Sequence, residues 1–272
     1  MSHSFHDFEH AGWDDLRVAA SYHRNLSDLT TSCIPELFRL ARLKRGDRTL
    51  DVACGAGYVA AKASDQGAET IGLDFAAAQI RLAEQTYPGM RFIEGDAGAL
   101  PFPSADFDVV FNAFGLPHMP DPAKVVAEAY RVLKPAGRFA YASWAEAAKC
   151  VAFSMIYDAI RTCGTLDVGL PPGPNFFSYG DPKYAEALLD QAGFVNVTTS
   201  EVPLVWRVDS PDVIIDAILT GTVRASAALK GQSPDSLTRI KQYMRERIAG
   251  FAKAGMYQVP APALVVAAVK PD

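Results

Sequence analysis

Short apolar runs alternate with longer amphipathic stretches over residues 46–145, and this alternation is the main structural signal in the chain. The apolar runs predict strands, and the stretches between them have the apolar spacing of helices. The predicted strands are residues 49–53, 69–74, 90–94, 107–112 and 137–143, and the predicted helices are residues 59–66, 77–87 and 122–133. Strands that alternate with helices favour an α/β fold with a parallel, doubly wound sheet.

The flanking segments predict further helices and strands. Residues 12–43 are typical of one or two helices that could lie across the mouth of the sheet. Residues 181–192 have clear helix boundaries, because Asp181 can cap the first turn and Gly193 follows the last. The other predicted elements are a helix at 150–163, a loop at 170–174, a long strand at 195–208 and a last strand at 263–269.

Helical patterning over residues 210–254 separates the last two predicted strands. We interpret this segment as a helical cap inserted into the sheet domain. The predicted organisation is an N-terminal helical lid at residues 1–45, a Rossmann-like core at 46–208 and 256–272, and a cap at 209–255.

Composition narrows the class of protein and of partner. Of 272 residues, 49% are hydrophobic and 21% charged, which is typical of a globular protein with a real core. The formal net charge of -5 provides no general attraction for phosphate backbones, so we expect no nucleic-acid partner. The basic residues Arg239, Lys241, Arg245 and Arg247 are interpreted as a solvated helix face.

Cysteine usage and hydropathy point to a cytoplasmic protein without a metal site. None of the cysteines (Cys33, Cys54, Cys150 and Cys163) forms a C-x-x-C pair, so we predict no metal site. The Met1 end lacks the apolar stretch of a signal peptide. No run of about 18 apolar residues predicts a membrane span. The oligomeric state is open.

The most informative segment is D-V-A-C-G-A-G, residues 51–57, which follows a predicted strand and opens a helix. Its glycines let the backbone approach a ligand closely, and the helix N-terminus favours electron-rich groups. Asp74 ends the next predicted strand, where a carboxylate can accept hydrogen bonds from both ribose hydroxyls of an adenosine ligand. These features predict a nucleoside-binding loop.

Two features favour S-adenosylmethionine over a dinucleotide. The third glycine of a G-x-G-x-x-G loop is replaced by Ala60, which is mild evidence because alanine is also small. The carboxylate of Asp51 would repel a pyrophosphate but suits an ammonium and a sulfonium; alternatively, it is a buried group that hydrogen-bonds the turn. Asp96, after the third strand, can bond the adenine amine beside the Ala97 N–H, or it can cap a turn.

Five motifs then occur in a fixed order: D-V-A-C-G-A-G, G-L-D-F, E-G-D-A-G-A-L-P-F-P, F-D-V-V and R-V-L-K-P-A-G-R-F-A. In this respect the chain resembles the class I S-adenosylmethionine-dependent methyltransferases. It is most similar to the branch around ubiquinone and menaquinone biosynthesis. The resemblance covers residues 40–145, whereas residues 150–272 are similar only in general layout.

The resemblance implies a seven-stranded sheet whose last strand is antiparallel. It places Asp51 and the loop glycines around the methionine part, Asp74 on the ribose and Phe75 against the adenine. The predicted cofactor-binding residues are Asp51, Ala53, Cys54, Gly55, Gly57, Asp74, Phe75, Gln79, Asp96, Ala97, Asn112, Ala113 and Phe114. One departure is Ala136, which stands where many relatives have glycine, and we expect the turn to tolerate it.

Methyl transfer to a small-molecule acceptor, with S-adenosylhomocysteine as product, is the predicted activity. It mainly requires alignment of donor and acceptor and exclusion of water. A general base is needed only if the acceptor must lose a proton. His118 is the best candidate because it follows the fourth strand, although it could instead pack or cap a helix. Tyr22, His23 and Tyr141 are further candidates.

Aromatic residues from two regions could enclose the acceptor: Phe5, Phe8 and Trp13 in a lid, and Phe176, Phe177 and Tyr179 opposite. Ordinary core packing is the alternative for each of them. We expect Cys54 to be a small packing residue and not a nucleophile. The acceptor itself is expected to be apolar or aromatic, with oxygen, nitrogen and carbon all open.

Other activities were weighed against these residues. The fourth strand is followed by N-A-F-G, so the N/D-P-P-Y/F motif of amino-methylating enzymes and the Pro-Cys nucleophile of cytosine carbon-5 enzymes are both absent. Asp121 alone does not supply the acidic cluster of the metal-dependent catechol type. A nicotinamide-dependent oxidoreductase shares the loop-and-acid layout. A non-catalytic S-adenosylmethionine-binding protein is the third possibility.

Overall fold

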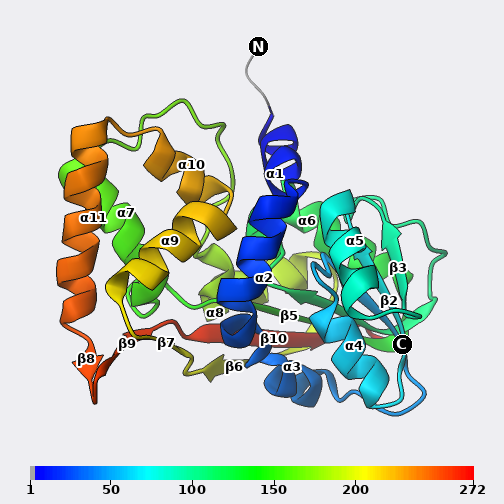
Figure 1. Ribbon diagram of the computed structural model, residues 1–272. Coiled ribbons are helices and arrows are strands. Elements are labelled where there is room, and N and C mark those ends of the chain that lie inside the picture. The colour runs from blue at the N-terminus through cyan, green and yellow to red at the C-terminus, as the bar shows by residue number, and fades with distance from the viewer. Residues whose placement is uncertain (1–3) are drawn as a thin grey trace.

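A computed structural model describes residues 4–272 of the chain (Figure 1). Its centre is a seven-stranded sheet with the strand order β3-β2-β1-β4-β5-β10-β6. The strands are β1 (Arg48–Val52), β2 (Glu69–Asp74), β3 (Arg91–Glu94), β4 (Phe107–Ala113), β5 (Leu133–Trp144), β6 (Val195–Val202) and β10 (Ala263–Val269). The first five are mutually parallel, and β10 runs antiparallel between β5 and β6. The predicted Rossmann-like sheet is therefore confirmed.

Helices cover both faces of this sheet. The helices α3 (Ile34–Ala41) and α4 (Tyr58–Asp65) pack in the apolar cluster on one face, together with α7 (Val151–Cys163). The opposite cluster contains α6 (Pro122–Val132) and α8 (Pro182–Gln191). Alternate residues of β4 serve the two clusters, with Phe111 in the first and Val110 in the second. This burial on both faces explains why the sequence of β4 is a nearly continuous apolar run.

The stretch 195–208, predicted as one strand, is divided between two sheets. Its second part, β7 (Val205–Val208), pairs with β9 (Met256–Pro260), which also pairs with β8 (Ala252–Lys253). Pro203 lies at the break, and a proline has no backbone N–H to continue the ladder. Across the same break, the Ala261 N–H donates to the Leu204 carbonyl at 2.9 Å. The prediction of a single strand was wrong for this reason.

Three helices precede the sheet: α1 (Phe5–Trp13), α2 (Leu16–Thr31) and α3. The helices α2 and α3 confirm the prediction for residues 12–43, whereas α1 lies mostly before that range and was not predicted. Ser4 caps α1 by accepting from the Asp7 N–H, and Asp15 caps α2. The prediction about the Met1 end, and the first three residues of the predicted lid, lie outside the described residues. No helix within residues 4–272 combines the length and apolarity needed to cross a bilayer.

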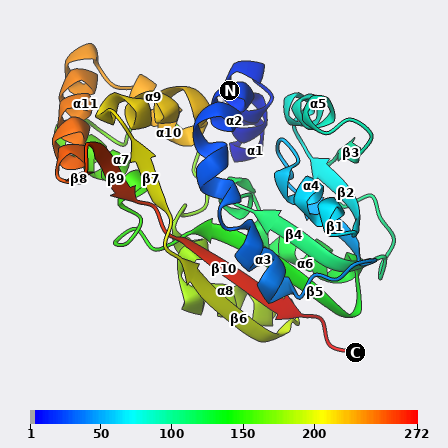
Figure 2. The ribbon, with the colours of Figure 1, turned by 60° about the horizontal axis from the view of Figure 1, so that its bottom comes forward.

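The helices α9 (Pro211–Gly221), α10 (Arg224–Lys230) and α11 (Pro234–Ala249) lie beside α7, away from the main sheet (Figure 1). In both views, α1 and α2 stand between this group and α5 (Ala77–Thr86) on the other side (Figure 2). Hydrogen bonds connect α2 to α9 on one side, and the segment just before α2 to α5 on the other. Ser21 Oγ lies 2.6 Å from Thr220 Oγ1 in α9, and Asp14 accepts from the Ala78 N–H of α5 at 2.8 Å.

Candidate active site

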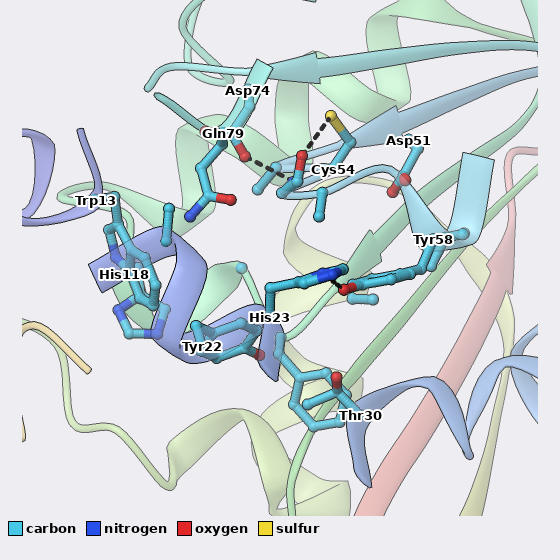
Figure 3. Close-up of a pocket in the computed structure, with 18 of the residues that line it drawn as sticks. Trp13, Tyr22, His23, Thr30, Asp51, Cys54, Tyr58, Asp74, Gln79 and His118 are labelled. Atoms are coloured by element: carbon cyan, nitrogen blue, oxygen red, sulfur yellow. Dashed lines mark hydrogen bonds between the residues drawn. The ribbon is translucent and has the colours of Figure 1, made fainter. Parts of the chain in front are cut away.

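The carboxyl ends of β1, β2 and β4 meet the N-terminal helices at a cavity that we call the loop pocket (Figure 3). Its lining comes from the glycine loop, from the segment after β2, from the segment after β4 and from α2. The lining residues are Trp13, Ala19, Tyr22, His23, Thr30, Thr31, Ile34, Asp51, Ala53–Ala56, Tyr58, Val59, Asp74, Phe75, Gln79, Ala113–Gly115, His118 and Met119.

The glycine loop has the backbone shape that its sequence suggests. Gly55 and Gly57 adopt φ values of 53° and 84°, in the left-handed region that favours glycine. A Cβ on Gly57 would also lie 2.6 Å from the ring of Phe92. Ala53 and Phe114, which both line the pocket, have positive φ values of 57° and 61° without being glycines. Such strained backbone is typical of functional sites.

Asp51 is a buried carboxyl group with unused hydrogen-bonding capacity. Its side chain is 1% exposed, and Oδ2 accepts from the Ala60 N–H at 3.1 Å. Oδ1 has no hydrogen-bond partner among the described residues. Burial, together with the nearby charge of Asp74, raises the pKa of Asp51 to about 8, although the hydrogen bond from Ala60 opposes the rise. The hydrogen bond to the turn occupies only one carboxyl oxygen. The other oxygen can therefore accept a hydrogen bond from a cationic group such as an ammonium.

Asp74 joins the glycine loop to the end of β2. One carboxylate oxygen accepts from the Gly55 N–H at 2.9 Å, and the other from the Ala76 N–H at 3.0 Å. Burial raises the pKa of Asp74 to about 6, although these backbone hydrogen bonds oppose the rise. Each oxygen has a further lone pair, so the group can accept two more donors. This is the arrangement that a ribose diol requires.

The structure places the other predicted cofactor residues in two groups. Ala53, Cys54, Phe75, Gln79, Ala113 and Phe114 line the loop pocket. Gly57, Asp96, Ala97 and Asn112 lie outside its lining. Asp96 is exposed and accepts from the Gly98 N–H at 2.8 Å, as a turn cap would. Their contacts with a ligand stay predictions.

Asn112 is fully buried and organises the segment after β4. Its amide nitrogen donates to the Val52 carbonyl at 3.0 Å. Its amide oxygen accepts from the Gly115 and Leu116 N–H groups at 3.1 and 3.0 Å. Asn112 therefore ties β1 to the loop that carries His118.

The candidate bases other than His118 have different surroundings. Tyr22 lines the loop pocket, but burial raises its pKa to about 12. His23 Nδ1 hydrogen-bonds the Tyr58 hydroxyl, and the planes of the two rings lie within 6° of each other (Figure 3). Tyr141 lies in the core beneath the sheet, where its hydroxyl donates to the Tyr179 carbonyl at 3.2 Å. Tyr141 therefore cannot reach a ligand in the loop pocket.

The Cys54 thiol has a pKa raised by burial, in agreement with a packing role.

A second cavity, the aromatic pocket, adjoins the loop pocket. It is lined by Glu9, Trp13, Tyr22, Leu26, Phe114, Pro117, His118, Trp144, Phe153, Ile156, Tyr157, Pro174, Phe176 and Thr222–Ala225. Trp13, Tyr22, Phe114 and His118 line both cavities. Of the predicted acceptor aromatics, Trp13 and Phe176 are among the lining residues, whereas Phe5, Phe8, Phe177 and Tyr179 are not.

A buried carboxylate anchors His118 where the two pockets adjoin. Glu9 Oε2 accepts from Trp13 Nε1 at 3.0 Å and lies 2.9 Å from His118 Nδ1. The Glu9 side chain is 1% exposed, and its Oε1 has no partner among residues 4–272. We did not predict a role for Glu9 from the sequence. The available signal was its spacing, because Phe5, Glu9 and Trp13 share one buried helix face.

Comparisons with known proteins agree with this architecture. Residues 50–141 match the model of a family described as a methyltransferase domain. The chain is 39% identical over 99 residues to a demethylmenaquinone methyltransferase of Renibacterium salmoninarum, covering 36% of this chain and 42% of the relative. It is 34% identical over 141 residues to a 27-O-demethylrifamycin SV methyltransferase of Amycolatopsis mediterranei, covering 49% and 50%. The chain thus spans half or less of the length of these two curated relatives.

A solved structure extends the likeness of fold to nearly the whole chain. The phosphoethanolamine N-methyltransferase 2 of Haemonchus contortus, in complex with S-adenosyl-L-methionine, superposes with a TM-score of 0.62. The sequence identity is 18%, and the match covers 99% of this chain and 60% of that one. Residues 50–141 thus match a methyltransferase domain and are similar in sequence to demethylmenaquinone methyltransferases, and the chain has the fold of a solved methyltransferase.

Proposed function

We propose that this protein transfers a methyl group from S-adenosylmethionine, held in the loop pocket, to a small molecule held in the aromatic pocket. The proposal rests on one observation: the two cavities share four lining residues. These are Trp13, Tyr22, Phe114 and His118. Ligands in both pockets would contact the same side chains. That proximity is what an in-line displacement requires.

The residues of the loop pocket fit the donor. Asp51 Oδ1, buried and without a partner in the described part of the chain, suits the ammonium of the methionine part. Asp74 can accept both ribose hydroxyls, and Phe75 and Gln79 lie beside it in the lining. When bound, S-adenosylmethionine supplies a methyl group activated by a sulfonium. The hydrogen-bonded pair His23 and Tyr58 would help to exclude water from the site.

The lining of the aromatic pocket favours an apolar, ring-containing acceptor. Trp13, Trp144, Phe153 and Phe176 offer ring faces and edges for such a molecule. The two curated relatives are named for small organic acceptors, a demethylmenaquinone and a demethylrifamycin. A small-molecule acceptor, without nucleic acid, and a cytoplasmic location are part of this proposal.

The first test is calorimetric titration with S-adenosylmethionine, S-adenosylhomocysteine and NAD, followed by transfer of an isotope-labelled methyl group to a panel of ring compounds. We expect the first two ligands to bind, and Asp74→Asn to weaken both by about 10- to 100-fold, because two charged hydrogen bonds to the ribose are lost. Asp190→Asn, on the exposed face of α8, is the matched control and should bind normally.

The outcomes separate the three activities weighed from the sequence. Donor binding with methyl transfer supports the proposal. Donor binding without transfer to any acceptor would favour a non-catalytic S-adenosylmethionine-binding protein. Binding of NAD alone would favour an oxidoreductase and contradict our interpretation of Asp51.

A further inference from the structure

The contacts of Glu9 lead to a more specific inference, which rests on the proposed function. We propose that Glu9 and His118 form a general-base pair that removes the proton from a phenolic hydroxyl bound in the aromatic pocket, so that the acceptor is methylated on oxygen. His118 would be the catalytic residue, and Glu9 would be a positioning residue that acts through it.

The geometry assigns different tasks to the two ring nitrogens of His118. An ionised carboxylate can only accept hydrogen bonds, so Nδ1, 2.9 Å from Glu9 Oε2, must carry a proton in this contact. The neutral ring then has its lone pair on Nε2. The His118 side chain is 23% exposed and lines both pockets, whereas Glu9 is 1% exposed. The imidazole of His118 thus lies between the aromatic pocket and the buried carboxylate of Glu9, which is the arrangement that general-base catalysis uses.

Trp13 holds the carboxylate in place. Its Nε1–H donates to the same Glu9 oxygen at 3.0 Å, and its ring packs edge-on against His118 with centroids 5.1 Å apart. Glu9 is therefore oriented by a side chain that also lines both pockets. Its second oxygen, Oε1, has no partner among the described residues, which is costly for a buried carboxylate. Such a cost is typical of a site that serves a ligand or a reaction.

The other ionisable groups of the aromatic pocket do not compete for this role. They are Tyr22 on α2, Tyr157 on α7 and Arg224 on α10. Burial raises the pKa of both tyrosines, so they stay protonated near neutral pH. The Arg224 guanidinium donates to the Pro171 carbonyl at 2.8 Å and lies 5.7 Å from the ring centre of Phe5. Among the described lining residues, this leaves His118 and the carboxylate of Glu9, which contacts its ring, as the groups suited to accept a proton.

A phenol matches these walls better than an amine does. A neutral phenol can enter an aromatic pocket without losing the hydration of a charge, whereas an ammonium would lose it. A phenolic oxygen also becomes a much stronger nucleophile when it loses its proton, so a positioned base has a use. A neutral amine has its lone pair available and does not need that step.

The proposed reaction is balanced in atoms and charge. The acceptor O–H bond breaks, its proton moves to His118 Nε2, and the oxygen lone pair forms the new bond to the methyl carbon. The carbon–sulfur bond of the donor breaks at the same time, and its electron pair stays on sulfur in S-adenosylhomocysteine. The imidazolium is stabilised by the Glu9 carboxylate and then releases its proton to solvent. No oxidant, reductant or metal takes part.

The first experiment compares two phenols of different acidity. At pH 8, 2-naphthol is mostly protonated, whereas 4-nitrophenol is mostly ionised and does not need a base. We expect His118→Gln to lower kcat/KM for 2-naphthol by about 100- to 10,000-fold. Glu9→Gln should lower it by about tenfold or more, because the tautomer is no longer fixed. Both variants should lose much less of their kcat/KM with 4-nitrophenol than with 2-naphthol, because the ionised phenol does not need a base. Glu186→Gln, exposed on α8, is the matched control.

The second experiment does not depend on turnover. The absorption of 4-nitrophenol bound to the protein saturated with S-adenosylhomocysteine reports whether the phenol is ionised. In the wild type, we expect its proton to pass to His118, so that the bound phenol titrates at lower pH than in His118→Gln or Glu9→Gln. A purely structural role for Glu9 would not change this titration selectively.

Several results would overturn the inference. Equal losses with both phenols would show that the variants damage the pocket and do not remove a base. Identical titrations of bound 4-nitrophenol in all proteins, or no binding of it, would refute the pair directly. Methylation of 2-naphthylamine but not of 2-naphthol would overturn the phenol assignment and leave methyl transfer intact. Failure to bind S-adenosylmethionine would refute the proposed function itself.

Discussion

The buried carboxyl group of Asp51 should make donor binding depend on pH. Its pKa is raised to about 8, first by burial and then by Asp74. At pH 7 in the absence of ligand, about one-tenth of the protein would carry an ionised Asp51, since one unit separates pH and pKa. The contact that we propose with the ammonium of the donor requires the ionised form. Ionising Asp51 at pH 7 therefore costs about 1.4 kcal/mol, which weakens binding about tenfold.

The same linkage predicts that binding releases protons. At pH 7, about 0.9 proton should leave Asp51 for each S-adenosylmethionine bound, and affinity should fall about tenfold from pH 7 to pH 6. Calorimetry in two buffers of different ionisation enthalpy measures this release. The variant Asp51→Asn should bind more weakly than the wild type at high pH, show little pH dependence between 6 and 7, and release almost no proton.

The control ligand is 5′-methylthioadenosine, which has the nucleoside but no ammonium. Asp74, with a pKa raised to about 6, is mostly ionised at pH 7 and releases only about a tenth of a proton for either ligand. The reasoning is refuted if the wild type releases no proton with S-adenosylmethionine. It is equally refuted if 5′-methylthioadenosine releases as many protons, because the ammonium would then not be the partner of Asp51.

Two further predictions concern backbone conformation. Gly57→Ala should lower the free energy of unfolding by about 2–4 kcal/mol, because the left-handed φ of 84° disfavours alanine and the new Cβ would meet Phe92; a urea midpoint equal to that of the wild type would contradict this. Ala136→Gly should raise the free energy of unfolding by up to about 1 kcal/mol, because Ala136 has a φ of 57°. Its donor affinity should not change, and a lower urea midpoint would show that the left-handed backbone at Ala136 is not strained.

The strands of the sheet could be predicted where the local pattern of apolar and polar residues determines where a strand begins and ends. The bounds of β2 and β10 match the predicted ranges, and for β10 the reason is a continuous apolar run. The split at Pro203 was missed because the alternation of residues continues through it, although the ladder does not. The start of α1 was missed because polar residues separate Phe5, Glu9 and Trp13, which share a helix face only once the helix exists.

The same distinction applies to the site. Asp51, Gly55 and Asp74 could be proposed from the sequence because their positions depend on one loop and two adjacent strands. Glu9 and Arg224 could not, because the aromatic pocket brings them together from opposite ends of the chain. No local pattern reports a contact over such a separation, and the pairing of Glu9 with His118 depends on how α1 docks.

The aromatic pocket, which we propose as the acceptor site, is thus walled mainly by segments outside the matched domain. The donor loop and its partner strand lie within residues 50–141, whereas Glu9, Trp144, Phe153 and Arg224 lie outside that range. Mutations in the outer segments can therefore alter the choice of acceptor while the donor loop is conserved. In evolutionary terms, one methyl-donating module can be retained while the chamber beside it diversifies, so relatives that share the motifs need not share an acceptor.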